Sequence, residues 1–497
     1  MKDVLYLNSR SLERTIVKKR FLLAVAALAL GASAAANAQT IVPLTHRAPD
    51  GAETVLLLTD GRALVQGDND SDWWTLTPDI NGSYVNGTWT QVASLPSGYS
   101  PYAQAQAVNI DGRVIIEGGE YNYGSFAFTN QGAVYDPVAN TWTMQSPPPL
   151  FDFIGDSPSV VLTNGKFMLG QKMTMRMAEL DPYTLTWTSL ASTGKSDWNA
   201  EEGWTTLPNG TVLTADVLNS PNSEHYDRAI QTWIQDGSTQ ALLMGPCEVD
   251  CANGIRGAWG TYYPPGEIGP AVLRPDGTVF ATGALHRGEA TGHTAVYTPS
   301  SPDQPGTWVK GPDFPGGDYC DDDFAALLTN GNVLVSSAFG SLYEFNGTTM
   351  TRTASGGGSL LVLPTGEVMI DGSSVYRSVG TYQQFWAPML FPLSVVAVKR
   401  GSTYTAYGSN FNGMSEAHGF GDEFQTATNY PLVRLTNMAT NHVFYARTHD
   451  HSSMGVRHLG SIAWTHFDVP AAAETGTTKM EVVTNGIPSN AITIMVY

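Results

Sequence analysis

Short apolar runs joined by tight turns recur along most of the chain. Such turns supply the backbone angles that match the twist of paired strands, so each unit predicts a β-hairpin. Seven segments share this pattern: LLLTDGRALVQG, AVNIDGRVIIEGG, VVLTNGKFMLG, TTLPNGTVLTA, VLRPDGTVFATG, ALLTNGNVLVS and LVLPTGEVMIDG. Their turn glycines are Gly61, Gly112, Gly165, Gly210, Gly277, Gly331 and Gly366.

A second pair of short strands is expected after most of these hairpins. AVYDPVANTWT, AELDPYTLTWT and EHYDRAIQTWI place Trp142, Trp187 and Trp233 at equivalent positions, and Trp89 and Trp308 extend the series. Four strands per unit and a period of about 50 residues are typical of kelch-type β-propeller blades. The pattern predicts an all-β chain in which residues 39–387 form a seven-bladed propeller. An array of β-sandwiches is disfavoured because every unit repeats one hairpin signature.

The repeat stops after Trp386, where Pro388 and Pro392 mark a linker. Segments such as PLVRLTN, HVFYART, WTHFDVP and KMEVVTN then alternate apolar and polar residues, as half-buried strands do. About 100 residues suffice for one immunoglobulin-like sandwich. Residues 388–497 are therefore expected to form an immunoglobulin-like β-sandwich.

The first 38 residues have the features of a secretory signal. Lys18, Lys19 and Arg20 precede an apolar run that is too short to span a bilayer, and small residues follow up to Ala38. We expect cleavage after Ala38 and a secreted or periplasmic protein. A buried N-terminal helix is the alternative.

Composition and charge narrow the classes of partner. The 497 residues include 51 Gly and 29 Pro, with 42% hydrophobic and 14% charged residues, which excludes a disordered chain and a coiled coil. The net charge of -19 argues against nucleic acid and against an anionic membrane surface. We expect a monomer without a membrane span, whose partner is a small polar molecule or a carbohydrate.

Three cysteines remain after the signal segment. In an exported protein Cys247 and Cys251 are close enough to form a small loop disulfide, with Cys320 left over. A metal-binding pair is the alternative, although three thiols do not complete a structural zinc site.

The predicted layout resembles a known family. A seven-bladed kelch propeller followed by a sandwich resembles galactose oxidase and the glyoxal oxidases, and NYPLVRLTNMATNHVFYARTHDHSSMGV resembles the early-set domain of bacterial galactose-oxidase-like proteins. This resemblance covers essentially residues 39–497. It implies a copper ion on the propeller axis, held by two tyrosines and two histidines, with one tyrosine bonded to a cysteine.

Two of the implied copper ligands have candidates here. His449 matches the histidine of the sandwich loop, and His451 is a nearby substitute. For the tyrosine before the second hairpin the matching position is Ala103, with Tyr102 one residue away, and an offset of one residue in a strand reverses the side chain.

The other two implied positions have no match. The Tyr-His pair of the sixth blade falls on Asp321 and Asp322, and no cysteine precedes the first hairpin in residues 39–497. Cys320 follows Tyr319, but in the sixth repeat. The sequence thus predicts that the Tyr-Cys thioether is absent and leaves the cofactor undecided, with copper or another divalent cation as the candidate.

Acidic residues occupy the positions just before the first strand of most hairpins. In a propeller these positions converge at one end of the central channel, where neighbouring carboxylates attract a cation or a polyhydroxyl ligand. The alternative is a solvated rim, since Asp and Glu are usually at the surface. The candidate ligand-binding residues are Glu53, Tyr102, Asp156, Glu201 with its neighbour Glu202, Glu267, and Asp322 within the run Asp321 to Asp323.

His449 and His451 flank Asp450 and are expected on one face of an extended segment. They are candidate metal ligands that would approach Asp322 and Glu201; a loop held by hydrogen bonds is the alternative.

Two further features are weaker candidates. Asp68 to Asp79 begins like a calcium loop but lacks its glycine, which favours a surface turn. Trp73, Trp74, Trp198, Trp204 and Trp259 could stack on sugars or anchor the core.

The sequence favours a protein that binds a polar, carbohydrate-like ligand, with or without a metal ion, at an acidic propeller end. The alternative is a copper-dependent oxidase of alcohols, aldehydes or sugars with a rearranged ligand set.

Overall fold

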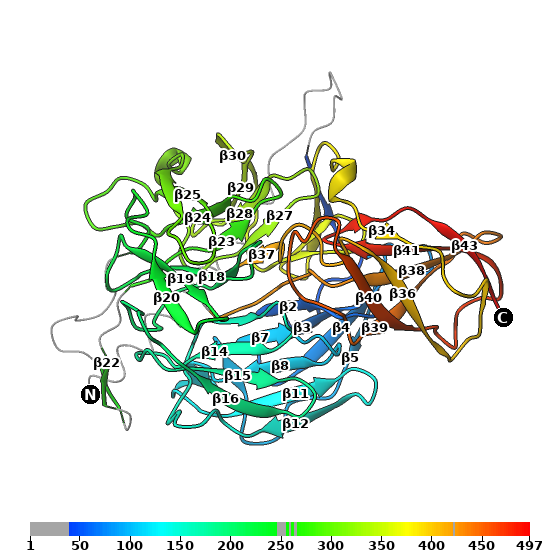
Figure 1. Ribbon diagram of the computed structural model, residues 1–497, viewed down its shortest axis with the longest axis horizontal. Helices are drawn as coiled ribbons and strands as arrows, with labels where there is room; N and C mark the ends of the chain where they lie inside the picture. The colour runs from blue at the N-terminus through cyan, green and yellow to red at the C-terminus, as the bar shows by residue number, and fades with distance from the viewer. Residues whose placement is uncertain (1–38, 246–254, 258–259, 263–265, 421–422) are drawn as a thin grey trace. The chain divides into compact units, whose positions relative to one another are not determined.

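β-Strands make up nearly all regular structure in the computed structural model, which describes residues 39–245, 255–257, 260–262, 266–420 and 423–497 (Figure 1). The helical elements among these residues are two short 3-10 turns, η1 (Pro315–Gly317) and η2 (Gln384–Trp386). The prediction of an all-β chain is confirmed. The predicted signal segment, residues 1–38, lies outside the described residues. In the described part of the chain, no helix is long and apolar enough to cross a membrane.

Seven antiparallel sheets each begin with one of the predicted hairpins, and each sheet is named here by its first strand. The β2 sheet contains β2 (Thr54–Leu57), β3 (Ala63–Gln66), β4 (Trp73–Thr77) and β5 (Thr88–Gln91). The β7 sheet contains β7 (Ala105–Val108), β8 (Val114–Glu117), β11 (Gly132–Asp136) and β12 (Thr141–Gln145). The β13 sheet contains β13 (Ser159–Val161), β14 (Phe167–Gly170), β15 (Met177–Asp181) and β16 (Thr186–Leu190). The β17 sheet contains β17 (Thr205–Thr206), β18 (Val212–Ala215), β19 (Ser223–Asp227) and β20 (Thr232–Gln235).

The remaining sheets of this series continue the pattern. The β23 sheet contains β23 (Ala271–Leu273), β24 (Val279–Thr282), β25 (Thr294–Thr298) and β26 (Thr307–Lys310). The β27 sheet contains β27 (Ala325–Leu327), β28 (Val333–Ser336), β29 (Ser341–Phe345) and β30 (Met350–Ser355), and β37 (His418–Gly419) adds a fifth strand. The β31 sheet contains β31 (Leu360–Val362), β32 (Val368–Ile370), β33 (Ser374–Arg377) and β1 (Thr40–Pro43). Smaller sheets are formed by β6 (Pro101–Tyr102), β9 (Tyr121–Asn122) and β10 (Ser125–Phe126), and by β21 (Ile255–Gly257) and β22 (Gly260–Tyr262).

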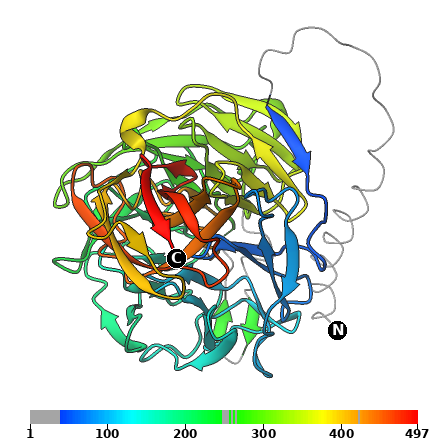
Figure 2. The same cartoon turned by 90° about the vertical axis from the view of Figure 1, so that its right-hand side faces the viewer.

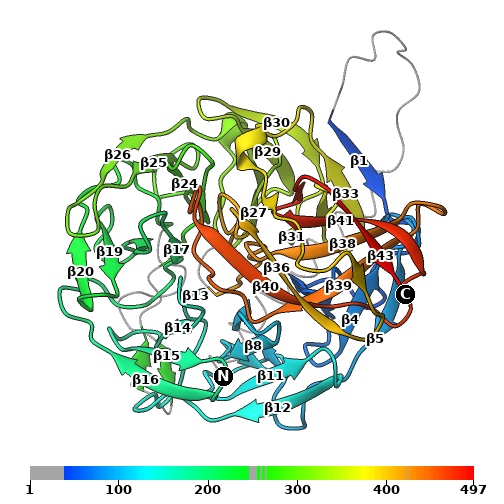
Figure 3. The same ribbon diagram turned by 45° about the vertical axis from the view of Figure 1, so that its right-hand side comes forward.

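The first strands of the seven sheets contact one another in chain order, from β2 through β7, β13, β17, β23 and β27 to β31. Because β31 also contacts β2, the series is closed (Figure 3). The N-terminal strand β1 pairs with β33 and so completes the last sheet. Apart from β27, which pairs with β37, the first strands lie at the edges of their sheets, so the series closes by contact between sheets and not by strand pairing.

Two local features stabilise these sheets. All seven turn glycines have φ between 80° and 94°, a region that costs little energy only for glycine. Tryptophans in the last strands join neighbouring sheets: the Trp142 indole donates to the Ala93 carbonyl and that of Trp308 to the Ser223 hydroxyl, at 2.9 and 2.7 Å. The repeated tryptophans of the sequence therefore act as packing anchors between sheets.

The C-terminal residues form a separate set of strands, which Figure 2 shows in orange and red. They are β34 (Met389–Leu390), β35 (Ala397–Val398), β36 (Thr403–Ser409), β38 (Leu432–Asn437), β39 (Val443–His449), β40 (Ile462–Asp468), β41 (Gly476–Thr484), β42 (Ile487–Pro488) and β43 (Ile492–Val496). Their pairing is antiparallel except between β35 and β43, and a hydrophobic core that includes Val433, Phe467 and Val482 lies within them.

The two ends of the first strands have different surroundings. We call the end where these strands begin, which carries Asp156 and Glu201, the acidic end. We call the opposite end, where the strands lead into the seven turn glycines, the turn end. The amides of Thr448, His451 and Met454 donate to carbonyls of Thr59, Ile110 and Thr163, at 3.0 to 3.2 Å. These carbonyls belong to three hairpin turns, so this C-terminal segment covers the turn end.

Candidate functional site

The predicted ligand-binding acids lie at the acidic end. Asp156 and Glu201 stand shortly before β13 and β17, and each is only 5% exposed. Glu267 is also buried before β23, whereas Glu53 and Asp322 are half-buried. At least the first two are therefore not part of a solvated rim, and their charges require compensation.

A buried lysine that the sequence analysis missed joins these two acids. The ammonium of Lys172 donates to Asp156 Oδ2 and to Glu201 Oε1, the second at 2.6 Å, and its side chain is completely buried. Hydrogen bonds between ionised groups are the strongest that side chains form, and they offset part of the cost of burying the charges. The lysine thus links the starts of the β13 and β17 sheets.

The register of the third hairpin accounts for the position of Lys172. β14 runs antiparallel to β13, so the end of β14 lies beside the start of β13. Lys172 follows β14 closely, and its amide donates to the Ile154 carbonyl at 3.0 Å. In the sequence, the signal for this contact is therefore a single lysine that closely follows an apolar strand.

The ionisation of Asp156 reflects this crowded setting. Burial raises the pKa of Asp156 well above its usual range, Lys172 lowers it in part, and the carboxylates of Glu201, Glu120 and Glu423 raise it further. Its second oxygen, Oδ1, is buried and has no hydrogen-bond partner among the described residues. A raised pKa favours the protonated carboxyl group, which can donate as well as accept a hydrogen bond.

A C-terminal segment reaches the first strands through β37. His418 lies opposite Ala326 of β27. The carboxylate of Glu416 accepts hydrogen bonds from the amide and the hydroxyl of Thr206, at 3.1 and 3.0 Å. Glu423 lies close enough to Asp156 to raise its pKa. Residues 416–420 and 423–425 therefore bring titratable groups to the first strands, with Glu423 near Asp156, which the sequence analysis did not predict.

Tyr102 belongs to an aromatic cluster beside this segment. Its ring centroid lies 6.0 Å from that of Phe424 and 6.1 Å from that of Tyr121. Phe424 is in turn parallel to Phe324, with centroids 6.1 Å apart. The half-buried tyrosine is thus packed against aromatic rings.

The structure does not bring the two candidate histidines to these acids. His449 Nδ1 lies 2.6 Å from Asp450 and Nε2 3.4 Å from Asp468, within the C-terminal strands. His451 is buried beside the turn after β7, bonded to Thr465 and parallel to the Tyr430 ring, and burial lowers its pKa to about 3. Both histidines therefore lie at the turn end, held by hydrogen bonds, while Asp156 and Glu201 lie at the opposite end of the first strands.

The described residues do not fit the copper site that the resemblance implies. Among residues 39–245, 266–420 and 423–497, no group of three or more His, Cys, Asp or Glu side chains is arranged to hold a metal ion. At the acidic end the carboxylates of Asp156 and Glu201 are already bonded to the Lys172 ammonium, and this fixed positive charge disfavours a second cation beside it. Cys320 is free and buried, with Sγ 3.2 Å from the Ser336 carbonyl, and burial raises the pKa of its thiol well above the usual range.

A second buried lysine lies next to the first site. Lys195 Nζ donates to Glu202 and Glu224, each at 2.9 Å, and stands 4.3 Å from the centroid of Trp233. The Trp204 indole also donates to Glu202, at 3.1 Å. Glu202, which the sequence grouped with Glu201, therefore serves a different ion pair.

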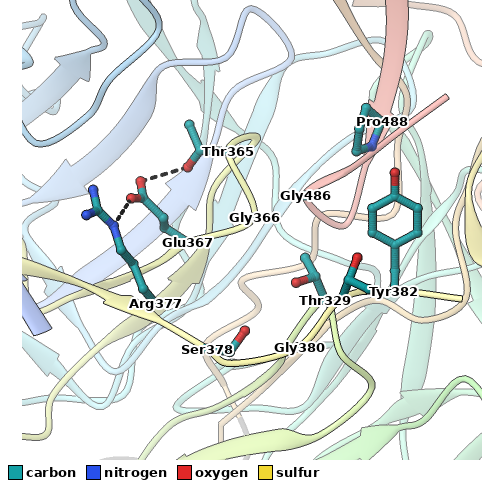
Figure 4. A pocket seen from close by; sticks show the side chains of 11 residues that line it. Thr329, Thr365, Gly366, Glu367, Arg377, Ser378, Gly380, Tyr382, Gly486 and Pro488 are labelled. Atoms are coloured by element: carbon teal, nitrogen blue, oxygen red, sulfur yellow. Dashed lines mark hydrogen bonds and ion pairs between the residues drawn. The ribbon is translucent and has the colours of Figure 1, made fainter. Parts of the chain in front are cut away.

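A polar cavity of about 390 Å³ lies at the turn end (Figure 4). It is bounded by Thr329, the Thr365–Glu367 turn and the hairpin at Gly486. Within it the Glu367 carboxylate accepts from Arg377 Nε at 2.6 Å. None of the predicted site residues lines this cavity.

The remaining candidates from the sequence are the tryptophans, the calcium-like loop and the predicted disulfide. Trp73 and Trp204 are buried, Trp198 is exposed, and Trp74 is half-buried. In the calcium-like loop, Asn69 Oδ1 accepts from the Asp72 amide at 2.8 Å, as in an ordinary turn. Cys247, Cys251 and Trp259 lie outside the described residues, so the disulfide stays a prediction.

Comparisons with known proteins found solved structures at low sequence identity. No family model and no curated protein matches the chain. A fungal alcohol oxidase of the AA5 family in complex with copper is 15% identical, with 93% of this chain and 99% of that chain covered and a TM-score of 0.48. A catalytically inactive virginiamycin B lyase from Staphylococcus aureus with quinupristin is 6% identical, with 68% and 97% covered and a TM-score of 0.44. An extracellular domain from B. thetaiotaomicron is 11% identical, with 93% and 58% covered and a TM-score of 0.45.

Proposed function

We propose that residues 39–387 form a seven-bladed kelch-type propeller, that residues 388–497 form an early-set, immunoglobulin-like domain, and that the protein is exported. Support for the first part comes from seven sheets that each begin with a predicted hairpin and whose first strands contact one another in a closed series. The size of the C-terminal strand set supports the second part.

We further propose that the acidic end binds a neutral polyhydroxyl ligand, such as a sugar. The observation that carries this proposal is the buried Asp156 Oδ1, which has no hydrogen-bond partner among the described residues although Oδ2 is bonded to Lys172. A buried acceptor without a partner costs about 1–3 kcal/mol, which a ligand donor would recover. A hydroxyl group suits this oxygen because it donates to a carboxylate and accepts from a carboxylic acid.

The charge at this site favours a neutral ligand over a cation. Lys172 already supplies a fixed positive charge between Asp156 and Glu201. A second cation placed beside it would be repelled in a buried, weakly screened setting. Binding of a polar ligand without a metal ion is therefore the function that the geometry supports best.

Titration calorimetry with glucose, galactose and glycerol tests the proposal. Asp156→Asn should weaken the binding of at least one of these compounds about tenfold, the loss expected for one hydrogen bond to a charged group. The control is Asp303→Asn, an exposed acid bonded to Ser301 and Gln304 of its own loop, which should leave affinity unchanged. Equal binding by both variants would contradict the proposed site.

The copper-dependent oxidase predicted as the alternative is tested in the same samples. Hydrogen peroxide released from these compounds after copper is added would favour the oxidase and contradict simple binding. Release that survives Asp156→Asn would also place that activity away from the acidic end.

A further inference from the structure

The acidic end contains a positive charge that belongs to the chain itself. Asp156 and Glu201 come from the starts of two different sheets, and Lys172 follows β14 of the first of these sheets. Two carboxylates that converge from separate elements on one buried cation form the arrangement in which proteins hold metal ions. Here the converging oxygens meet an ammonium group instead.

We infer that Lys172 is a built-in cation that takes the place of a metal ion at the acidic end and makes the site selective against cations. This inference rests on the geometry of Lys172, Asp156 and Glu201 and does not depend on the proposed polyhydroxyl ligand. The consequence is that a substitution that removes the ammonium group and leaves its volume empty creates a site for a divalent cation.

The nature of the remaining groups supports this consequence. Without Lys172, Asp156 and Glu201 present carboxylate oxygens toward one point, and Glu120 and Glu423 lie close enough to influence Asp156. Ca²⁺ prefers carboxylate oxygens and tolerates irregular coordination completed by water. Truncating lysine to alanine removes four heavy atoms beyond Cβ, which is enough space for one ion of this size and its water.

Two substitutions separate the effect of charge from the effect of space. Lys172→Ala removes both the charge and the side chain, whereas Lys172→Met removes the charge but fills nearly the same volume. We expect Lys172→Ala to bind Ca²⁺ at least tenfold more tightly than the unaltered protein. Lys172→Met should gain much less, because its side chain occupies the position of the ion.

The experiment is titration calorimetry with CaCl₂ on the full chain, the two single variants and the double variant Lys172→Ala/Asp156→Asn. The double variant should lose most of the gain, and CaCl₂ should raise the melting temperature of Lys172→Ala more than that of the other three proteins. A folded Lys172→Ala protein with no gain would overturn the inference.

The unaltered protein provides a test that does not depend on any lysine variant. If it binds Ca²⁺ as tightly as Lys172→Ala, or binds Ca²⁺ in a way that Asp156→Asn abolishes, Lys172 does not act in place of the ion and the inference is wrong. If Lys172→Ala folds only when CaCl₂ is present, that dependence supports the inference.

Discussion

Two buried lysines in neighbouring sheets differ in how completely their partners are bonded. Lys195 lies between Glu202 and Glu224, and Lys172 lies between Asp156 and Glu201. Each pair of carboxylates holds one ammonium. Among the described residues, a donor reaches every carboxylate oxygen of Glu202 and Glu224, whereas one oxygen of Asp156 has none.

Around Lys195 the additional donors are neutral groups. Glu224 accepts from the Ser196 amide at 2.9 Å and from Gln235 at 2.7 Å, in addition to the lysine. Around Lys172, by contrast, Asp156 Oδ1 has no partner in the described part of the chain. A fully bonded ion pair fixes structure, whereas an unused acceptor is available to a ligand, so completeness of bonding distinguishes the two lysines.

The largest expected effect is on stability at the fully bonded pair. Lys195→Met leaves Glu202 and Glu224 buried without a positive charge, and we expect the free energy of unfolding to fall by about 3–5 kcal/mol. Denaturation in guanidinium chloride measures this change. Lys310→Met, which removes an exposed lysine paired with Asp313, is the control and should cost less than about 1 kcal/mol.

A buried carboxyl group without a lysine provides the next test. The Glu416 carboxylate accepts hydrogen bonds from the amide and the hydroxyl of Thr206, and burial raises its pKa from near 4.5 to about 7. The folded state therefore holds a proton that the unfolded state has released between these pH values, so stability is lost as the pH rises through this window. Glu416 should account for a loss of about 3 kcal/mol between pH 4.5 and pH values above 7.

Glu416→Gln should remove this part of the pH dependence. Unfolding free energies measured at several pH values from 4.5 to 8 should decline less steeply in the variant. An identical decline in both proteins would show that Glu416 is already ionised in the folded state.

A smaller loss is expected at the incompletely bonded pair. Burial raises the pKa of Asp156, so Asp156 can take up a proton when Lys172 is replaced, which lowers the cost of losing the ammonium. We expect Lys172→Met to reduce the unfolding free energy by about 1–3 kcal/mol, and by less at pH 5 than at pH 8. A loss as large as that of Lys195→Met, and independent of pH, would remove the distinction between the two lysines.

The smallest effect is expected far from both lysines. His449 pairs with Asp450 and Asp468, which are more than one third exposed. His449→Gln should change stability by less than about 1 kcal/mol and leave ligand affinity at the acidic end unaltered. A tenfold loss of affinity in this variant would mean that the turn end and the acidic end act together.

The repeating part of the fold could be predicted from local sequence. Each Asp/Asn-Gly-like turn determines the backbone of its own hairpin, and all seven glycines adopt the positive φ that such turns require. The tryptophans of the last strands were equally visible, because their positions repeat with the hairpins. These features depend on residues close together in the chain, so the sequence by itself determined them.

The candidate site depends on contacts that local patterns do not contain. Counting from the turns placed Asp156 and Glu201 at one end, but the same count grouped Glu202 with them, although its side chain serves Lys195. The φ of Glu201 is 54°, so the chain is not extended at this point, and only the packed sheets decide which lysine each side chain meets.

Tertiary structure also decided which C-terminal segment reaches the first strands. The sequence analysis predicted that His449 would approach the acids, but His449 lies at the turn end. Instead, β37 pairs with β27 and brings Glu416 and Glu423 to the first strands. Nothing within the segment around Glu416 marks it as a strand of a distant sheet, because a pairing across about 90 residues is determined by the partner edge that β27 leaves open. Hairpins are thus encoded by their own residues, whereas the ion pairs of the acidic end arise only when seven sheets and this segment pack together.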